Sequence, residues 1–180
     1  MTHPEAVLQF WFERLQPEQR FAKDAAMDAQ IRREFLGTWQ AAARGELSPW
    51  RERLSGRLAE IIVLDQFSRN LWREDARSFA QDGMALVLSQ EAQRQAGFAQ
   101  LGANEHQFLL MPMMHSESLL IQDASLPLFQ RYCGDSVHGF AVRHRDIIAR
   151  FGRYPHRNTI QKRNSTPEEL AFLQQPGSSF

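Results

Sequence analysis

Apolar residues recur along this chain at helical spacing, and no segment alternates apolar and polar residues for long enough to predict a strand. One stripe steps by three or four positions through residues 24–44 and contains Met27, Ile31, Phe35, Trp39 and Ala42. Gly45 follows directly, so we expect the helix to end there. Residues 56–72 predict another helix, which is apolar nearly all round between 58 and 64 and is therefore expected to be central.

Capping patterns and prolines mark further helices. Thr2-His3-Pro4-Glu5 and Thr166-Pro167-Glu168-Glu169 both place a capping residue before a proline and a glutamate, which predicts a helix start at each. Pro112 is expected to open a helix that runs to about residue 132, and Pro127 is expected to end or kink it. The other expected helices span about 75–96, 105–111 and 137–151.

Seven to nine helices with short connectors predict a single all-α domain over residues 1–180. Residue usage agrees, because 20 Ala and 19 Leu stand against 5 Val, 7 Ile and 4 Thr. Successive helices would pair as antiparallel hairpins. Periodicity leaves open whether the pairs form a superhelical array or a closed bundle, since no repeat of about 34 residues is visible.

Charge and cysteine content narrow the classes of binding partner and the cellular compartment that we expect. The 21 basic and 21 acidic residues give zero net charge, which argues against a dedicated nucleic-acid or anionic-membrane binder. No apolar run approaches the roughly 20 residues of a membrane span, and the N-terminal residues do not resemble a leader. Cys133 is the only cysteine, so no intrachain disulfide can form. We therefore expect a soluble cytoplasmic protein.

Charged residues on otherwise apolar stripes indicate the candidate site, because burying them unpaired costs several kcal/mol. Asp65 and Arg69 lie four residues apart on the stripe of the central helix, and Asn70 follows. This acid–base pair can serve a binding site. The alternative is a structural ion pair that closes the core.

Glu117 is the only carboxylate on the stripe of the helix expected after Pro112. It is a candidate general acid or base, and the alternative is a buried partner for an arginine such as Arg69. His115 lies roughly 200° away around the helix. The two would not share a face unless the first turn were irregular, and His115 can alternatively serve as a hydrogen-bonding residue at the helix end.

A basic region near the C-terminus supplies the other candidates. His144 lies at the centre of the apolar stripe of 137–151, where it is a second candidate acid or base or, alternatively, a satisfied core histidine. Between residues 131 and 163, eight basic residues face two acidic ones, and Arg145 belongs to this excess. The run of residues 153–158 predicts an anion cradle, because guanidinium forks and turn N–H groups all donate hydrogen bonds; its polar side chains are Arg153, His156, Arg157 and Asn158.

Metal and cofactor sites are not predicted. His115, Glu117, His144 and His156 are of ligating types, but no His-x-x-x-His or Glu-x-x-His spacing places two ligands on one helix face. The sequence also contains no glycine-rich phosphate loop, dinucleotide fingerprint or Gly-x-Ser-x-Gly elbow.

Several long motifs in order now carry a resemblance: 7–12 (VLQFWF), 64–70 (LDQFSRN), 111–117 (MPMMHSE), 143–146 (RHRD), 150–158 (RFGRYPHRN) and 165–169 (STPEE). With them the chain resembles a bacterial family, domain of unknown function nine-twenty-four. The resemblance implies an all-α fold related to the tetratricopeptide-like superhelices, and it implies no reaction. Where the family pattern continues to Leu-Gly-Arg, this chain has Gln161-Lys162-Arg163, so we expect the backbone of that turn to differ.

Two functions follow as hypotheses. The first is a pocket for a small anionic molecule, in which Glu117 or His144 acts as acid–base and the other candidates bind the ligand, namely Asp65, Arg69, Asn70, His115, Arg145, Arg153, His156, Arg157 and Asn158. The second is a non-enzymatic tetratricopeptide-like scaffold that binds a peptide or protein through Trp11, Trp39, Trp50 or Trp72. The aromatic-rich N-terminal helix is also a candidate homodimer surface.

Overall fold

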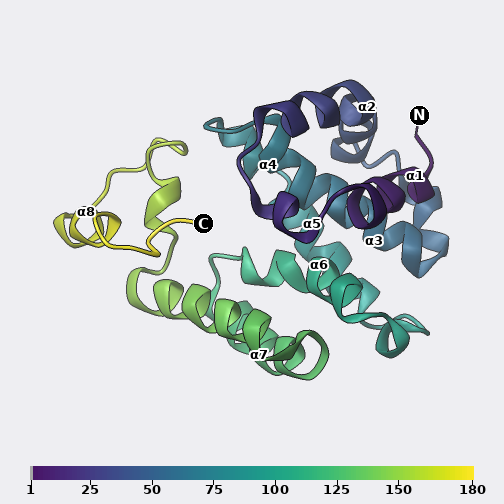
Figure 1. Ribbon diagram of the computed structural model, residues 1–180. Coiled ribbons are helices and arrows are strands. Elements are labelled where there is room, and N and C mark those ends of the chain that lie inside the picture. The colour runs from purple at the N-terminus through teal and green to yellow at the C-terminus, as the bar shows by residue number, and fades with distance from the viewer. Residues whose placement is uncertain (1) are drawn as a thin grey trace.

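In the computed structural model, which describes residues 2–180, every regular element is helical, so the predicted all-α class is confirmed (Figure 1). The α-helices are α1 (Pro4–Gln9), α2 (Ala25–Ala43), α3 (Leu54–Ile62), α4 (Ser68–Leu71), α5 (Asp82–Ala92), α6 (Ala103–Met114), α7 (Leu119–Phe151) and α8 (Pro167–Leu173). Over these residues, no helix combines the length and the apolar character that a bilayer crossing requires.

The N-terminal half packs around α3, as its apolar pattern predicts. Leu58, Ile61 and Ile62 are fully buried, and α3 contacts α1, α5 and α6. The predicted stripe of α2 faces this core along its whole length. Asp24 begins α2 by accepting hydrogen bonds from the backbone N–H groups of residues 26 and 27. The core is therefore organised around α3, with the apolar stripe of α2 packed against α4 and the turn at 63–67.

The predicted continuous helix over 56–72 is interrupted. A π-helical turn, Val63–Phe67, separates α3 from α4, and the helical segment ends at Leu71. Asp65 lies inside this wider turn and is buried. π-Turns inside helices recur at functional sites because they redirect side chains. Here the turn places a carboxylate where a regular core helix would carry an apolar residue.

The predicted helix over 75–96 is present but shorter than expected, and the predicted helix start at Pro112 is wrong. A short 3-10 turn, Ala76–Ser78, precedes α5, which begins only at Asp82. Pro112 lies inside α6, two residues before its end. A non-helical link, residues 115–118, then joins α6 to α7. Because this link is not helical, the separation of roughly 200° that a regular helix would give His115 and Glu117 does not apply to them.

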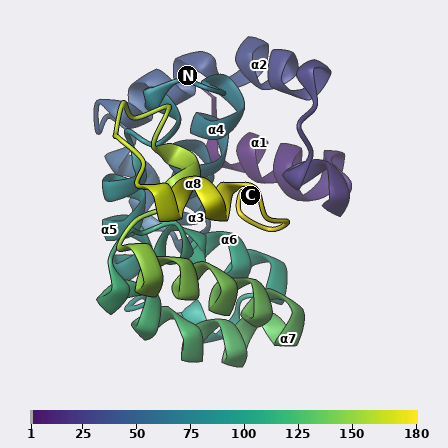
Figure 2. The ribbon, with the colours of Figure 1, turned by 90° about the vertical axis from the view of Figure 1, so that its left-hand side faces the viewer.

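The helix α7 is a hairpin of two arms. Its break lies at Gly134, with φ 81° and ψ 171°, and not at Pro127 as predicted. The arms run side by side in Figures 1 and 2, and Arg145 Nε donates to Asp123 Oδ1 across them at 2.7 Å. Glycine adopts this positive φ without the steric cost that a Cβ adds. The hairpin confirms a separate helix over 137–151.

The two predicted helix caps differ in outcome. Thr166 caps α8 with the expected capping box, in which Glu169 reaches back to the Thr166 N–H. The predicted box at the N-terminus is wrong, because His3 precedes α1 without a side-chain cap. The helix α8 and the segment after it lie at one end of the molecule, beyond the hairpin (Figures 1 and 2). There Ile147, Ile148 and Tyr154 form a small buried cluster apart from the main core.

Candidate functional site

A cavity of about 250 Å³ opens where three parts of the chain meet. These are the start of α5, the link between α6 and α7, and the turn after α7 that contains the 3-10 helix Pro155–Arg157. Its polar lining thus combines residues that are up to about 80 positions apart in sequence. The lining residues are Phe79, Asp82, Gly83, Leu86, Pro112, His115, Ser116, Glu117, Arg157 and Gln161.

His115 is held by Asp65 from behind the cavity wall. Its Nδ1 lies 2.7 Å from Asp65 Oδ1, and the Asp65 carboxyl also accepts from Gln66 Nε2 at 2.6 Å. An ionised carboxylate can only accept, so Nδ1 carries the proton and donates it. The link after α6 therefore presents an imidazole with its tautomer set by a buried aspartate.

This tautomer leaves His115 Nε2 as a hydrogen-bond acceptor. Within residues 2–180, no protein group bonds to Nε2, and the atom is not among those sealed from solvent without a partner. Burial lowers the pKa of His115 below its usual value, and the Arg69 cation lowers it further, which together outweigh the attraction of Asp65. The imidazole is thus neutral near pH 7 and has a free lone pair.

Two guanidiniums share one carboxylate beside this imidazole. Arg69 bonds bidentately to Asp82, with both N–O distances at 3.0 Å, and contacts Asp65 Oδ1 at 3.2 Å. Arg157 reaches the same Asp82 at 3.2 Å and donates to the His115 carbonyl at 3.0 Å. Although burial alone raises the pKa of Asp65, the neighbouring His115 and Arg69 hold it well below its usual range. The predicted Asp65–Arg69 ion pair is therefore present, within a larger network.

Arg157 is the cation of the cavity wall. Its side chain is only 5% exposed and lies over the rings of Phe79 and Tyr154 at 4.4 and 4.7 Å. Its Nε is buried without an acceptor. Burial lowers the pKa of Arg157, and the nearby Arg69 adds to this effect. A desolvated guanidinium with unused donor capacity favours an anionic partner.

Glu117 lines the cavity but is fully engaged. Arg163 donates to both of its oxygens, at 2.7 and 2.9 Å, and the Tyr154 N–H donates to Oε1 at 2.7 Å. Burial alone raises the pKa of Glu117, yet the Arg163 hydrogen bonds bring it below its ordinary value. The partner is thus Arg163, not Arg69 as suggested from the sequence. The carboxylate joins the cavity wall to the turn after α7.

Four of the predicted binding residues lie elsewhere in contacts of their own. Asn70 donates to Asp28 of α2 at 2.8 Å. Arg145 pairs with Asp123 at the surface, and Arg153 binds Glu169 of α8 bidentately at 2.7 and 2.8 Å. Asn158 is buried and holds Ser165 and Arg163. These contacts connect structural elements, and none of the four residues lines the cavity.

His144 and His156 form a second group on the far side of Tyr154. His144 is buried, donates from Nδ1 to the Phe140 carbonyl at 2.8 Å, and does not line the cavity. Burial lowers the pKa of His144 to about 3 and that of His156 to about 4. Both imidazoles pack against the ring of Phe180.

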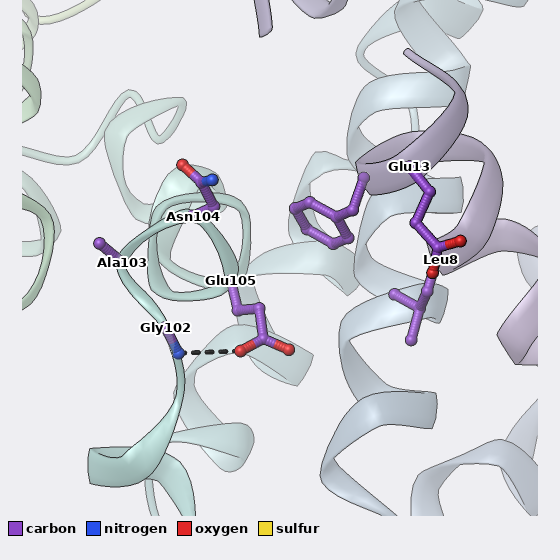
Figure 3. Close-up of a pocket in the computed structure, with 7 residues that line it drawn as sticks. Leu8, Glu13, Gly102, Ala103, Asn104 and Glu105 are labelled. Carbon is purple, nitrogen blue, oxygen red and sulfur yellow. Dashed lines mark hydrogen bonds between the residues drawn. The ribbon is translucent and has the colours of Figure 1, made fainter. Parts of the chain in front are cut away.

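A larger cavity of about 490 Å³ lies between the N-terminal helix and the start of α6 (Figure 3). Leu8 and Glu13 face Gly102–Glu105 across it, and the Glu105 carboxylate already bonds to the Gly102 N–H at 2.8 Å. No buried titratable group lines it. Over residues 2–180, no three His, Cys, Asp or Glu side chains converge as a metal ion requires. The smaller cavity is therefore the better candidate site.

Comparison with known proteins gives two matches. Residues 7–177 match the family described as bacterial protein of unknown function (DUF924). The chain belongs to this family. A solved structure of a protein of unknown function from Agrobacterium tumefaciens is 36% identical, with a TM-score of 0.90 over 95% of this chain and 96% of that one. A search of curated proteins finds no match.

Membership in the DUF924 family confirms the predicted resemblance, and one departure from its pattern can now be located. Lys162 stands where the expected family pattern has glycine, and it adopts φ 55°. The backbone is therefore left-handed at a residue whose side chain disfavours that conformation. Arg163, the next residue, still reaches Glu117.

Residues that sequence reasoning missed complete the network. Asp82 lies on the predicted helix of 75–96, and no neighbouring residue distinguishes it. In the sequence Arg163 is one of the basic residues in excess near the C-terminus, and Phe79 is one apolar residue among many. The 75-residue separation of Asp82 and Arg157 leaves no local trace in the sequence. One local signal does point to this turn: Lys162, directly before Arg163, stands where the family pattern has glycine, and its φ is positive.

Proposed function

We propose that this protein binds a small anionic molecule in the 250 Å³ cavity and acts on it through His115 as a general acid–base. The observation that carries the proposal is the Asp65–His115 pair, with His115 on the cavity wall and no protein group bonded to its Nε2 within residues 2–180. A buried carboxylate that fixes an imidazole tautomer is how proteins orient a proton acceptor. Such an arrangement is costly to bury, and an ordinary core would fill the same space with apolar groups.

His115 replaces Glu117 and His144 in the acid–base role that the sequence suggested. Glu117 already accepts three hydrogen bonds, so it has little capacity left for a substrate proton. His144 lies behind Tyr154 and outside the cavity lining. His115 alone among the three combines a fixed tautomer, an open nitrogen and a place on the wall.

Arg157 supplies the anion contact in this proposal. It lies within hydrogen-bonding distance of the His115 carbonyl, so a ligand held by its guanidinium would lie close to the imidazole. A carboxylate and a phosphate share the chemistry that a guanidinium fork recognises. The cavity volume suits a molecule of metabolite size.

A thermal-shift panel with inorganic phosphate, pyrophosphate, acetate and succinate tests this binding. At a hundredfold excess over Kd a bound anion adds about 2.7 kcal/mol, which raises Tm by roughly 5–10 °C in a chain of this size. Arg157→Gln is expected to lose the shift. Arg145→Gln removes the same charge at an exposed site and is expected to keep it. The proposal fails if no probe shifts the wild type or if Arg157→Gln shifts equally.

The peptide-binding scaffold receives less support from the packing. Trp11 and Trp39 are buried in the core, and Trp39 Nε1 donates to Ser68 Oγ at 2.8 Å. Trp50 and Trp72 are partly buried against the same core. A peptide groove needs aromatic anchors that face solvent. The tetratricopeptide-like relationship, the cytoplasmic setting and the homodimer stay predictions from the sequence.

A further inference from the structure

Phe180 contacts three rings that do not line the cavity at Arg157. Its ring centroid lies 3.7 Å from that of His144, 4.7 Å from His156 and 5.3 Å from Tyr154. The contacts with His156 and Tyr154 are edge-on, at 69° and 84°. These two contacts lie in the range of about 4.5–7 Å in which edge-on aromatic rings attract one another, and the tilted His144 ring lies closer. We call His144, Tyr154 and His156 the three-ring site.

The three-ring site is built of rigid parts. His144 belongs to the second arm of α7 and is fixed by its bond to the Phe140 carbonyl. The Tyr154 hydroxyl accepts from Gln122 Nε2 at 2.7 Å and donates to the Met114 carbonyl, and its ring is fully buried. Its backbone N–H is held by Glu117. His144 and Tyr154 are therefore held in place by contacts other than those with Phe180.

The occupant, in contrast, is loosely held. Phe180 remains 54% exposed although three rings contact it, and residues 174–177 before it are exposed. Over this segment one side-chain hydrogen bond is present, from Ser178 Oγ to the Leu173 carbonyl at 3.2 Å. Few buried contacts and an exposed backbone are the features of a segment that opens at low cost.

The covered state also leaves a polar group unsatisfied. His156 Nδ1 is buried without a hydrogen-bond partner, which costs free energy, and Phe180 packs against the same imidazole. A purely structural plug would be expected to satisfy the groups that it buries. The unpaired nitrogen is therefore a free-energy cost of the state in which Phe180 covers the site.

We propose that the three-ring site binds a planar aromatic group of a ligand, and that Phe180 is its internal, displaceable occupant. An incoming aromatic group would replace the Phe180 ring and gain the same edge-on contacts. Its affinity is reduced by the fraction of molecules in which Phe180 covers the site. This site differs from the Arg157 cavity, so the inference stands or falls independently of the proposed anion binding.

Titration with benzyl alcohol, a neutral aromatic probe, tests the inference by NMR of the histidine imidazoles. Phe180→Ala is expected to bind the probe at least about fivefold more tightly than the wild type, because the competing ring is gone. The His144 and His156 signals should shift in both proteins. Phe21→Ala removes another exposed phenylalanine, which stacks on Phe108 and not on the three rings, and should leave the affinity unchanged.

Cyclohexylmethanol has the apolar bulk of the probe without its aromatic ring. It is expected to bind at least threefold more weakly, since it lacks the ring quadrupole that the edge-on contacts need. Equal binding of the two alcohols would identify a general apolar surface and overturn the inference. Equal benzyl alcohol affinity in the wild type and Phe180→Ala, or unmoved His144 and His156 signals, would overturn it as well.

Discussion

Asp65→Asn is expected to lower the free energy of unfolding by about 3–5 kcal/mol. The side chain is 1% exposed and faces three donors, His115 Nδ1, Gln66 Nε2 and Arg69. Asparagine offers one oxygen and turns an N–H group toward donors, so it leaves an uncompensated cation and an unpaired imidazole N–H in the core. Urea unfolding of the two proteins at pH 7.5 measures the difference.

Asp123→Asn is the matched control. It makes the same chemical change in an ion pair with Arg145, but there the carboxylate is 49% exposed. Exposed pairs contribute up to about 1 kcal/mol, so we expect a loss no larger than that. Similar losses for the two substitutions would show that Asp65 is not the buried centre of the network.

Lowering the pH from 7.5 to 5 is expected to reduce the free energy of unfolding by about 4 kcal/mol through His144 and His156. In the folded chain their pKa values fall to about 3 and 4, whereas an unfolded histidine titrates near 6.5. The unfolded state therefore takes up protons first as the pH falls. Each histidine contributes stability that is complete above pH 6.5 and is lost below it, at about 1.4 kcal/mol per pH unit.

Urea unfolding at several pH values between 5 and 7.5 measures this slope. The double variant His144→Phe/His156→Phe keeps aromatic rings at both positions and should remove most of the decline. His3→Gln changes a histidine whose side chain is 84% exposed and should leave the decline in place. A wild-type stability that is flat over this range would contradict the assignment of these histidines as buried and neutral.

Helical periodicity predicts the fold because a long apolar stripe depends only on residues that are close together in the sequence. The stripe of α2 and the cap of α8 need only neighbouring residues, and both were predicted correctly. Pro112 was misplaced because proline is favoured in a first turn, yet α6 tolerates it two residues before its end. The π-turn around Asp65 and the break at Gly134 depend on tertiary packing, which a stripe does not reveal.

The site was predictable in its residue types and not in its pairing. The apolar stripe indicated Asp65 and the basic run at 153–158 indicated Arg157, and both take part in the network beside the cavity. His115 lies off its predicted stripe, yet it lines the cavity. The partners of Asp65 and Arg157 lie 50 and 75 residues away along the chain, and a single sequence does not show which residues pair at such separations. The irregular link after α6 places both His115 and Glu117 on the wall of the same cavity, and helical periodicity does not predict this.

The central claim is that His115 Nε2 is an unprotonated acceptor open to an anion held by Arg157. Nitrogen-15 NMR of the imidazole measures this directly in the wild type, with His115→Asn to assign the signal. We predict the Nδ1–H tautomer at pH 7 and a change at Nε2 when the anion that stabilises the protein is added. A protonated Nε2 at pH 7, or an Nε2 signal unmoved by that anion, would contradict the account.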